Sequence, residues 1–152
     1  MTRVQKLCAA YESFGIAIAN VPDDRAKVLS RTSAGVREFV TAALQRVPKP
    51  TPSQVATGLE QGWRETPGLI QEIAQQWRSD VSRAWTDANR AHYPEFLVNE
   101  EQRLNKVIAR GKIKTESEFF RVRHQIDILE GEVAQKDDLQ TLYSLVDAYE
   151  SR

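Results

Sequence analysis

Hydrophobic residues recur at intervals of three and four along most of the chain, which is the pattern of helices that bury one face. The first series runs from Val4 to Val21, and a second spans residues 24–46. Ser33–Gly35 is the weak point of the second series, since glycine is a poor helix former. Together the two series predict an N-terminal helical hairpin over residues 1–46.

A proline-rich strap is predicted over residues 47–53. Pro48, Pro50 and Pro52 stand at alternate positions, and each fixes its own backbone and keeps the preceding residue out of the helical region. We interpret the strap as a stiff connection that crosses the surface between helices. A polyproline II ligand for an aromatic groove is the alternative.

The middle segment, residues 54–93, carries the three tryptophans. A short helix is expected after Ser53, and Thr66–Pro67 is expected to cap a longer helix over residues 67–91. The apolar positions of that longer helix lie along one side and give the clearest amphipathic pattern in the chain.

The C-terminal segment, residues 94–152, should contain the remaining helices. Gly111 is expected at the left-handed end of one helix, and Thr115 with Glu118 is expected to form a capping box at the start of the next. Gly131 should end that helix, and Lys136–Asp138 should open the last one.

No segment alternates apolar and polar residues as a half-buried strand would. We therefore predict an all-α fold in one domain, residues 1–152, built as a bundle or array of six to seven helices. The longest apolar stretch, Phe14 to Ala19, is far too short to span a membrane. The lone Cys8 fits a buried position and a reducing compartment, so a cytoplasmic location without membrane association is expected.

The sequence offers no recognisable catalytic, cofactor or metal site. His92 and His124 are the only histidines, and Arg121 stands where a helical metal motif ending in His124 would need Glu. The glycines are scattered, so no phosphate-binding loop is expected. Both histidines are expected at the surface, although a catalytic site assembled around either from distant residues stays an open third alternative.

Charge is segregated near the C-terminus although 21 basic and 21 acidic residues cancel over the chain. Residues 100–124 hold seven basic and four acidic side chains, and residues 125–152 hold two and seven. These bases could contact an acidic protein or phosphates, or could pair with the acidic last helix. The candidate basic binding residues are Arg103, Lys106, Arg110, Lys112, Lys114, Arg121 and Arg123.

Trp63, Trp77 and Trp85 are further candidate binding residues, because tryptophan is enriched at binding hot spots. The alternative is that they belong to the core, which is the common place for large aromatics on an apolar helix stripe.

The favoured function is that of a non-enzymatic, bacterial-type protein that covers the surface of a protein partner, as an adaptor, a chaperone-like factor or a toxin-neutralising immunity protein does. The alternative is a nucleic-acid-associated regulator that uses the basic 103–124 region. Whether a second copy of the chain also binds stays open.

Overall fold

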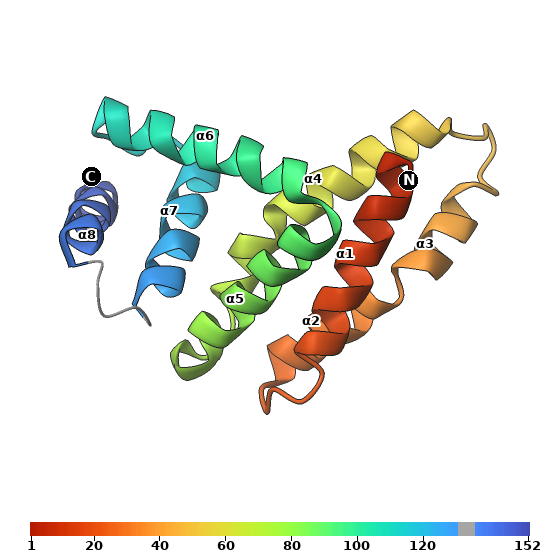
Figure 1. The fold of residues 1–152 in the computed structure, drawn as a ribbon, viewed down its shortest axis with the longest axis horizontal. Helices are drawn as coiled ribbons and strands as arrows, with labels where there is room; N and C mark the ends of the chain where they lie inside the picture. Colours follow the sequence, from red (N-terminus) through yellow and green to blue (C-terminus); the bar gives the residue numbers. More distant parts are fainter. Residues whose placement is uncertain (131–135) are drawn as a thin grey trace.

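The computed structural model describes residues 1–130 and 136–152, which form eight helices and no strand (Figure 1). The prediction of an all-α chain is confirmed. In Figure 1, α6 runs across the top of the molecule, and α7 and α8 lie beneath its far end, opposite α3. The helices are α1 (Arg3–Ala17), α2 (Asp24–Ala34), α3 (Val36–Ala43), α4 (Pro52–Ile70), α5 (Gln75–His92), α6 (Pro94–Arg110), α7 (Glu116–Leu129) and α8 (Lys136–Glu150).

The predicted boundaries of the C-terminal helices are largely confirmed. Gly111 ends α6 in the left-handed region, with φ of 76°. Thr115 caps α7 by accepting the amide of Glu118 at 3.1 Å. The Glu118 carboxylate accepts the amide of Lys114 at 2.8 Å, so only half of the predicted capping box forms. Gly131, the predicted end of this helix, lies outside the described residues, and α8 begins at Lys136 as predicted.

The helix predicted over residues 24–46 is divided into α2 and α3 at Gly35, inside the predicted weak point. Packing against α1 explains why α2 stops there. A Cβ on Gly15 of α1 would lie 2.7 Å from the backbone of Ser30 and of Ala34, so α2 sits directly on the α1 backbone. The Ser30 hydroxyl donates to the Gly15 carbonyl at 2.6 Å and fixes this crossing.

The prediction that Thr66–Pro67 starts a new helix was wrong. Helix α4 begins with a capping box between Thr51 and Gln54 and continues through Pro67, where proline removes a single backbone hydrogen bond. An apolar stripe that includes Trp63, Pro67 and Ile70 is buried across the predicted boundary and favours the continuous helix. The true break is at residues 71–74, where Asp23 accepts the Ala74 amide at 3.1 Å.

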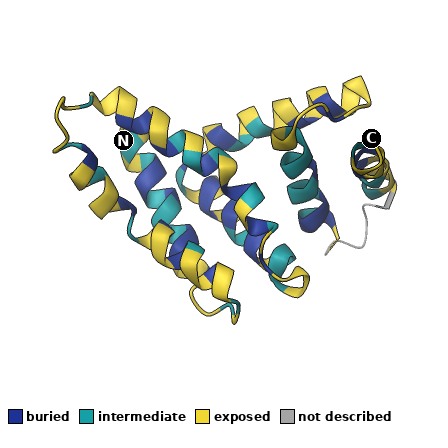
Figure 2. Cartoon of the chain, turned by 180° about the vertical axis from the view of Figure 1, so that it is seen from behind, coloured by how far each residue is buried: buried dark blue, intermediate teal, exposed yellow. Residues whose placement is uncertain are grey.

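The apolar interior consists of two clusters (Figure 2). The first core is built from α1 to α6 around Trp63, which is completely buried and contacts Tyr11, Phe14 and Trp85. The predicted burial of Cys8 in this core is confirmed. The second core joins the C-terminal half of α6 to α7 and α8. Its buried members are Leu104, Val107, Ile113, Val122, Ile126, Leu129, Leu142, Leu145 and Val146.

Candidate functional site

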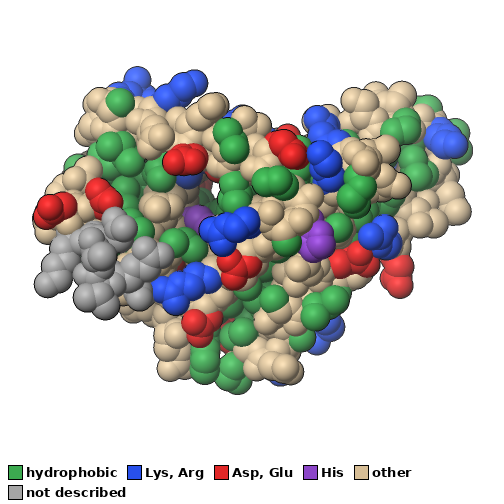
Figure 3. Space-filling model, viewed as in Figure 1, with side chains coloured by type: hydrophobic (Ala, Val, Ile, Leu, Met, Phe, Trp, Pro, Cys, Tyr) green, Lys and Arg blue, Asp and Glu red, His purple; other side chains and the backbone are tan. Residues whose placement is uncertain are grey.

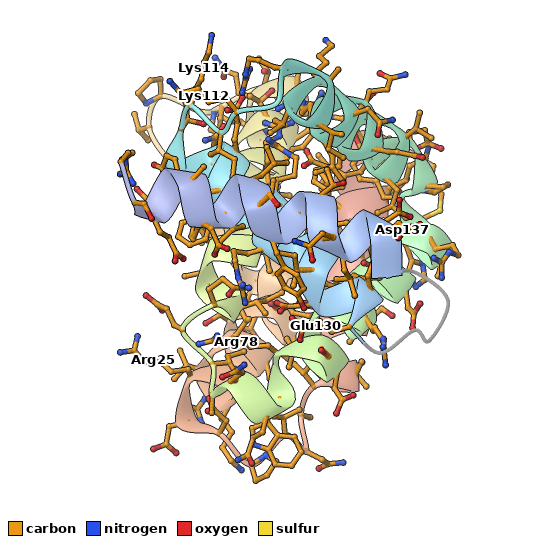
Figure 4. All side chains as sticks on the ribbon, turned by 90° about the vertical axis from the view of Figure 1, so that its left-hand side faces the viewer. Arg25, Arg78, Lys112, Lys114, Glu130 and Asp137 are labelled. Atoms are coloured by element: carbon orange, nitrogen blue, oxygen red, sulfur yellow. The ribbon has the colours of Figure 1, made fainter. Side chains whose placement is uncertain are left out.

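Five of the predicted basic residues are exposed at the end of α6 and in the turn after it: Arg103, Lys106, Arg110, Lys112 and Lys114. Arg110 forms an ion pair with Glu118 of α7. Among the described residues, no ion pair joins this series to α8. Lys112 and Lys114 project at the top of Figure 4, well away from Asp137 at the start of α8. The described ion pairs therefore give no support to pairing between the two charged regions.

Arg121 and Arg123, predicted with the exposed bases, are instead mostly covered, at 12% and 21% side-chain exposure. Arg121 Nε donates to Glu100 Oε2 of α6 at 2.8 Å. Arg123 Nε donates to Gln71 at 3.4 Å, and Arg123 lies 3.8 Å from the carboxylate of Asp127. Both arginines join helices to one another inside the molecule.

Two of the three tryptophans are core residues. Trp63 and Trp85 are 0% and 2% exposed, and Trp63 donates its indole hydrogen to Asn89 at 2.6 Å. Trp77 is partly buried and packs against the edge of the first core. Trp63 and Trp85 therefore offer no exposed ring to a partner, whereas Trp77 stays partly exposed.

A groove that the sequence did not predict opens between α1, α3 and the start of α4. We call it the N-terminal groove; it has a volume of about 440 Å³. Val40 and Leu44 form one wall, and Phe39 on the same helix is 53% exposed. Val47, in the strap, is 97% exposed. The complete lining is Thr2, Arg3, Val4, Val40, Leu44, Pro52, Ser53, Val55 and Ala56.

The segment that forms α3, the strap and the start of α4 has an excess of basic residues. Residues 36–57 hold three basic side chains, Arg37, Arg46 and Lys49, and a single acidic one, Glu38. Arg37 pairs with Glu12 of α1, and the guanidinium of Arg46 lies 5.8 Å from the centre of the Phe39 ring. Figure 3 shows hydrophobic and basic side chains side by side at this end of the molecule. The described residues place no ion pair on Arg46, on Lys49 or on Arg3, which lines the groove.

Helix α7 has two different faces. Its apolar face packs into the second core, whereas its polar face meets α4 and α5. Asp127 on the polar face is 3% exposed and accepts hydrogen bonds from Gln71 at 2.8 Å and Ser82 at 3.4 Å. Burial raises the pKa of Asp127, and the Gln71 hydrogen bond opposes that shift. The two cores are thus joined partly through buried polar contacts.

A series of partly buried charged side chains extends this polar junction toward α6. The Tyr93 hydroxyl donates to Glu60 at 2.5 Å, and Glu60 lies 3.3 Å from Arg64. Arg64 Nε faces Glu100 Oε1 at 3.5 Å without hydrogen-bond geometry, and Glu100 binds Arg121 as described above. Burial, together with the hydrogen bond to Glu60, raises the pKa of Tyr93 to about 12. Each carboxylate in this series, Glu60 and Glu100, has a cationic neighbour, so the series is a structural network of ion pairs.

His124 lies at the edge of this network with intermediate exposure, and it is hydrogen-bonded instead of fully solvated. Its Nε2 is 3.1 Å from the Thr86 hydroxyl, and its ring packs edge-on against Trp85 with centroids 4.9 Å apart. Burial lowers the pKa of His124 to about 4, so the imidazole is neutral at pH 7.

His124 and Trp85 line a cavity of about 590 Å³ between α4, α5, α6, α7 and α8. We call it the junction cavity, and the surface beneath α6 is hollowed at this face (Figure 3). Neither Trp85 Nε1 nor His124 Nδ1 has a hydrogen-bond partner among the described residues. No described carboxylate is hydrogen-bonded to His124, so the arrangement that a catalytic histidine–acid pair requires is not formed there.

Among the described residues, no group of three or more His, Cys, Asp or Glu side chains is placed to hold a metal ion. None of the described helices combines the length and apolar character needed to cross a membrane. Comparison of the chain with models of protein families, with curated proteins and with solved structures finds no match.

Proposed function

We propose that the chain is a non-enzymatic protein-binding module, and that the N-terminal groove receives an acidic amphipathic segment of its partner. The carrying observation is the coincidence, at one end of the molecule, of an apolar groove with Arg3, Arg46 and Lys49, basic side chains that form no ion pair with any described residue. An apolar face would enter the groove, while acidic residues beside it would meet the surrounding lysines and arginines.

The apolar arc of α3 supports this proposal. Val36 and Ala43 are buried against the body of the molecule, whereas Val40 and Leu44 line the groove and Phe39 is half exposed. At 100° per residue, these five side chains form one continuous arc. The buried Val36 and Ala43 are at the centre of the arc, and Val40 and Leu44 at one edge of it are open to the groove, where the apolar face of an amphipathic helix would pack.

Two synthetic amphipathic peptides test the proposal. Both carry the same leucine face, but the polar face of one is glutamate and that of the other is lysine. Fluorescence anisotropy with the complete chain should show binding of the acidic peptide, weakening as salt rises. The lysine peptide should bind at least about tenfold more weakly, since its charges meet the basic surface. Equal affinity for the two peptides would contradict the proposal.

Matched variants locate the binding surface. Leu44→Glu places a carboxylate on the groove wall and should weaken acidic-peptide binding about tenfold or more. Leu69→Glu is the control, because Leu69 is 47% exposed but lies about 20 Å further along α4. If Leu69→Glu weakens binding as much as Leu44→Glu does, the groove is not the site.

Anionic lipid vesicles test the alternative that the basic, apolar surface binds a membrane surface. Phosphatidylserine vesicles are sedimented with the chain in the presence and absence of the acidic peptide. Retention of the chain by vesicles, with no measurable peptide binding, would replace the proposed partner with a lipid surface.

Nucleic acid binding is a second candidate because Arg103, Lys106, Lys112 and Lys114 are exposed and form no ion pair with any described residue. It predicts a mobility shift of DNA or RNA at low salt that Lys112→Glu reduces and Lys27→Glu does not. Unchanged mobility of both nucleic acids at low salt would remove this candidate.

A further inference from the structure

The junction cavity lies between the two cores. Its wall takes Trp85 from the first core and Leu104, Leu129 and Leu142 from the second. Its volume of about 590 Å³ falls within the range of small-molecule sites, which often lie between the helices of a bundle. Exposed residues of α6 and α8 form part of the lining, so the cavity is accessible from solvent.

Helix α6 presents one carboxylate within an apolar stripe. Leu97, Glu101, Leu104 and Ile108 follow one another at intervals of four, three and four residues, so they share one face of α6, and all four line the cavity. Leu97 is partly buried and Ile108 is 36% exposed, which leaves apolar surface for a ligand to cover. Glu101 is exposed on the same face. A ligand that covers the stripe therefore comes close to the Glu101 carboxylate.

Helix α8 adds a second carboxylate to the cavity. Asp138 lies in the first turn of α8, and it shares a face with Thr141 and Leu142, which also line the cavity. Leu142 is 2% exposed within the second core, whereas Asp138, one turn earlier, is exposed. Neither Asp138 nor Glu101 forms an ion pair with any described residue.

The other charged residues of the lining already have partners of opposite charge. These ion pairs join Glu100 to Arg64 and Arg121, and Arg90 to Asp87. The imidazole of His124 is neutral at pH 7, as described above. Among the described residues, the charge of the cavity that is not balanced by an ion pair is therefore negative. A cationic ligand would be attracted to it, and an anionic ligand would be repelled.

We propose that the junction cavity binds a small organic cation with an apolar body, of the chemical class of hydrophobic amines. The apolar body packs against Leu97, Leu104 and Ile108, and the ammonium group lies near Glu101 and Asp138. Because both carboxylates are exposed, the ammonium keeps part of its hydration and avoids most of the cost of burying a charge. The cavity shares no lining residue with the N-terminal groove, so this site does not depend on the proposed function.

Three probes with the same phenyl ring test the charge preference. Phenethylamine, phenethyl alcohol and phenylacetate are a cation, a neutral molecule and an anion at pH 7. Each is titrated into the complete chain while methyl ¹H–¹³C resonances are recorded by NMR. Phenethylamine should shift the resonances of Leu97 and Ile108, and should bind about threefold more tightly than the alcohol and about tenfold more tightly than phenylacetate. The resonances of Val98 and Leu44 are the references, since neither residue lines this cavity.

Matched charge variants locate the ammonium group. The double variant Glu101→Gln with Asp138→Asn should make the affinities for phenethylamine and phenethyl alcohol nearly equal. The double variant Asp137→Asn with Glu150→Gln removes the same charge from positions that do not line the cavity, and should keep the preference. All four positions are exposed, so both variants are expected to fold.

Three results would overturn the proposal. Phenethyl alcohol or phenylacetate binds the native chain as tightly as phenethylamine, or the two double variants change the preference equally. The third is that no methyl resonance of the lining shifts up to the solubility limit of the probes.

Discussion

Helices α3 and α8 are the two outlying helices of the fold, and they bury their apolar residues to different extents. On α8, Leu142, Leu145 and Val146 are 2%, 7% and 4% exposed, because α6 and α7 cover them. On α3, Phe39 is 53% exposed, and Val40 and Leu44 border an open groove. The apolar side chains of α8 are therefore buried within the chain, whereas those of α3 are only partly covered. That difference, together with the basic residues of α3 and the strap, supports the proposal that a partner binds at the α3 end.

The largest predicted effect tests whether the apolar face of α8 is tightly packed in the second core. Leu142→Ala removes a buried side chain and should lower the free energy of unfolding by about 2–5 kcal/mol. Hydrogen exchange should accelerate mainly in α7, α8 and the end of α6. A urea titration measures the loss, and a loss below about 0.5 kcal/mol would mean that α8 is not tightly packed.

The polar junction should contribute almost as much to the free energy of unfolding. Helix α8 packs on α7, and α7 is joined to the first core partly through polar contacts. Arg121→Met leaves Glu100 with only the longer contact to Arg64, and should lower the unfolding free energy by about 2–3 kcal/mol. The double variant Arg121→Met with Glu100→Gln should recover part of that loss, since the stranded charge is gone. Equal losses in the single and double variants would show that the ion pair is not coupled.

Lowering the pH should reduce the stability of the protein because His124 at this junction is buried in its neutral form. Its folded pKa of about 4 lies below the ordinary value of 6.5, so the unfolded chain takes up the proton first. Stability should therefore fall as pH falls from about 6.5 to about 4, by about 1–3 kcal/mol given that the ring is partly accessible. His124→Gln should lose this acid dependence, and His92→Gln should retain it. Urea titrations at a series of pH values measure the difference.

The smallest predicted effect concerns the stability contribution of α3. Phe39→Ser should change the free energy of unfolding by less than about 1 kcal/mol, because half of the ring is already exposed. Phe39 lies outside the groove lining, so this change should leave binding of the acidic peptide nearly unchanged, whereas Leu44→Ser on the groove wall should markedly weaken it. A large loss of stability in Phe39→Ser, or unchanged binding by Leu44→Ser, would contradict this assignment.

The hydrophobic pattern predicted the fold class, the caps at Gly111 and Thr115 and the start of α8, because these depend on nearby residues. It misplaced the boundary at Thr66–Pro67, since tertiary burial of the α4 stripe outweighs the local preference of proline. The candidate site residues were predicted less well than the fold. Arg121 looked like part of an exposed basic series because its partner, Glu100, lies on another helix, where helical spacing cannot reveal the pair.

The N-terminal groove does not follow from a local motif, because its walls come from α1, α3 and α4. The walls of the junction cavity likewise come from five helices, α4 to α8. Two signals were nevertheless present in the sequence. The excess of three basic residues over one acidic residue in residues 36–57 can be counted directly, and the wide apolar arc of α3 exceeds what a short helix at the periphery buries.

Site-specific photocrosslinking in the native host tests the central claim most directly. A photoreactive phenylalanine analogue is placed at Val47, which is 97% exposed beside the groove, and separately at Leu69, which is 47% exposed and distant from it. The account predicts a crosslink at position 47 to one protein, at a segment with an apolar face flanked by acidic residues, and none to that protein at position 69. Equal crosslinking at both positions, or a crosslinked segment without acidic residues, would contradict it.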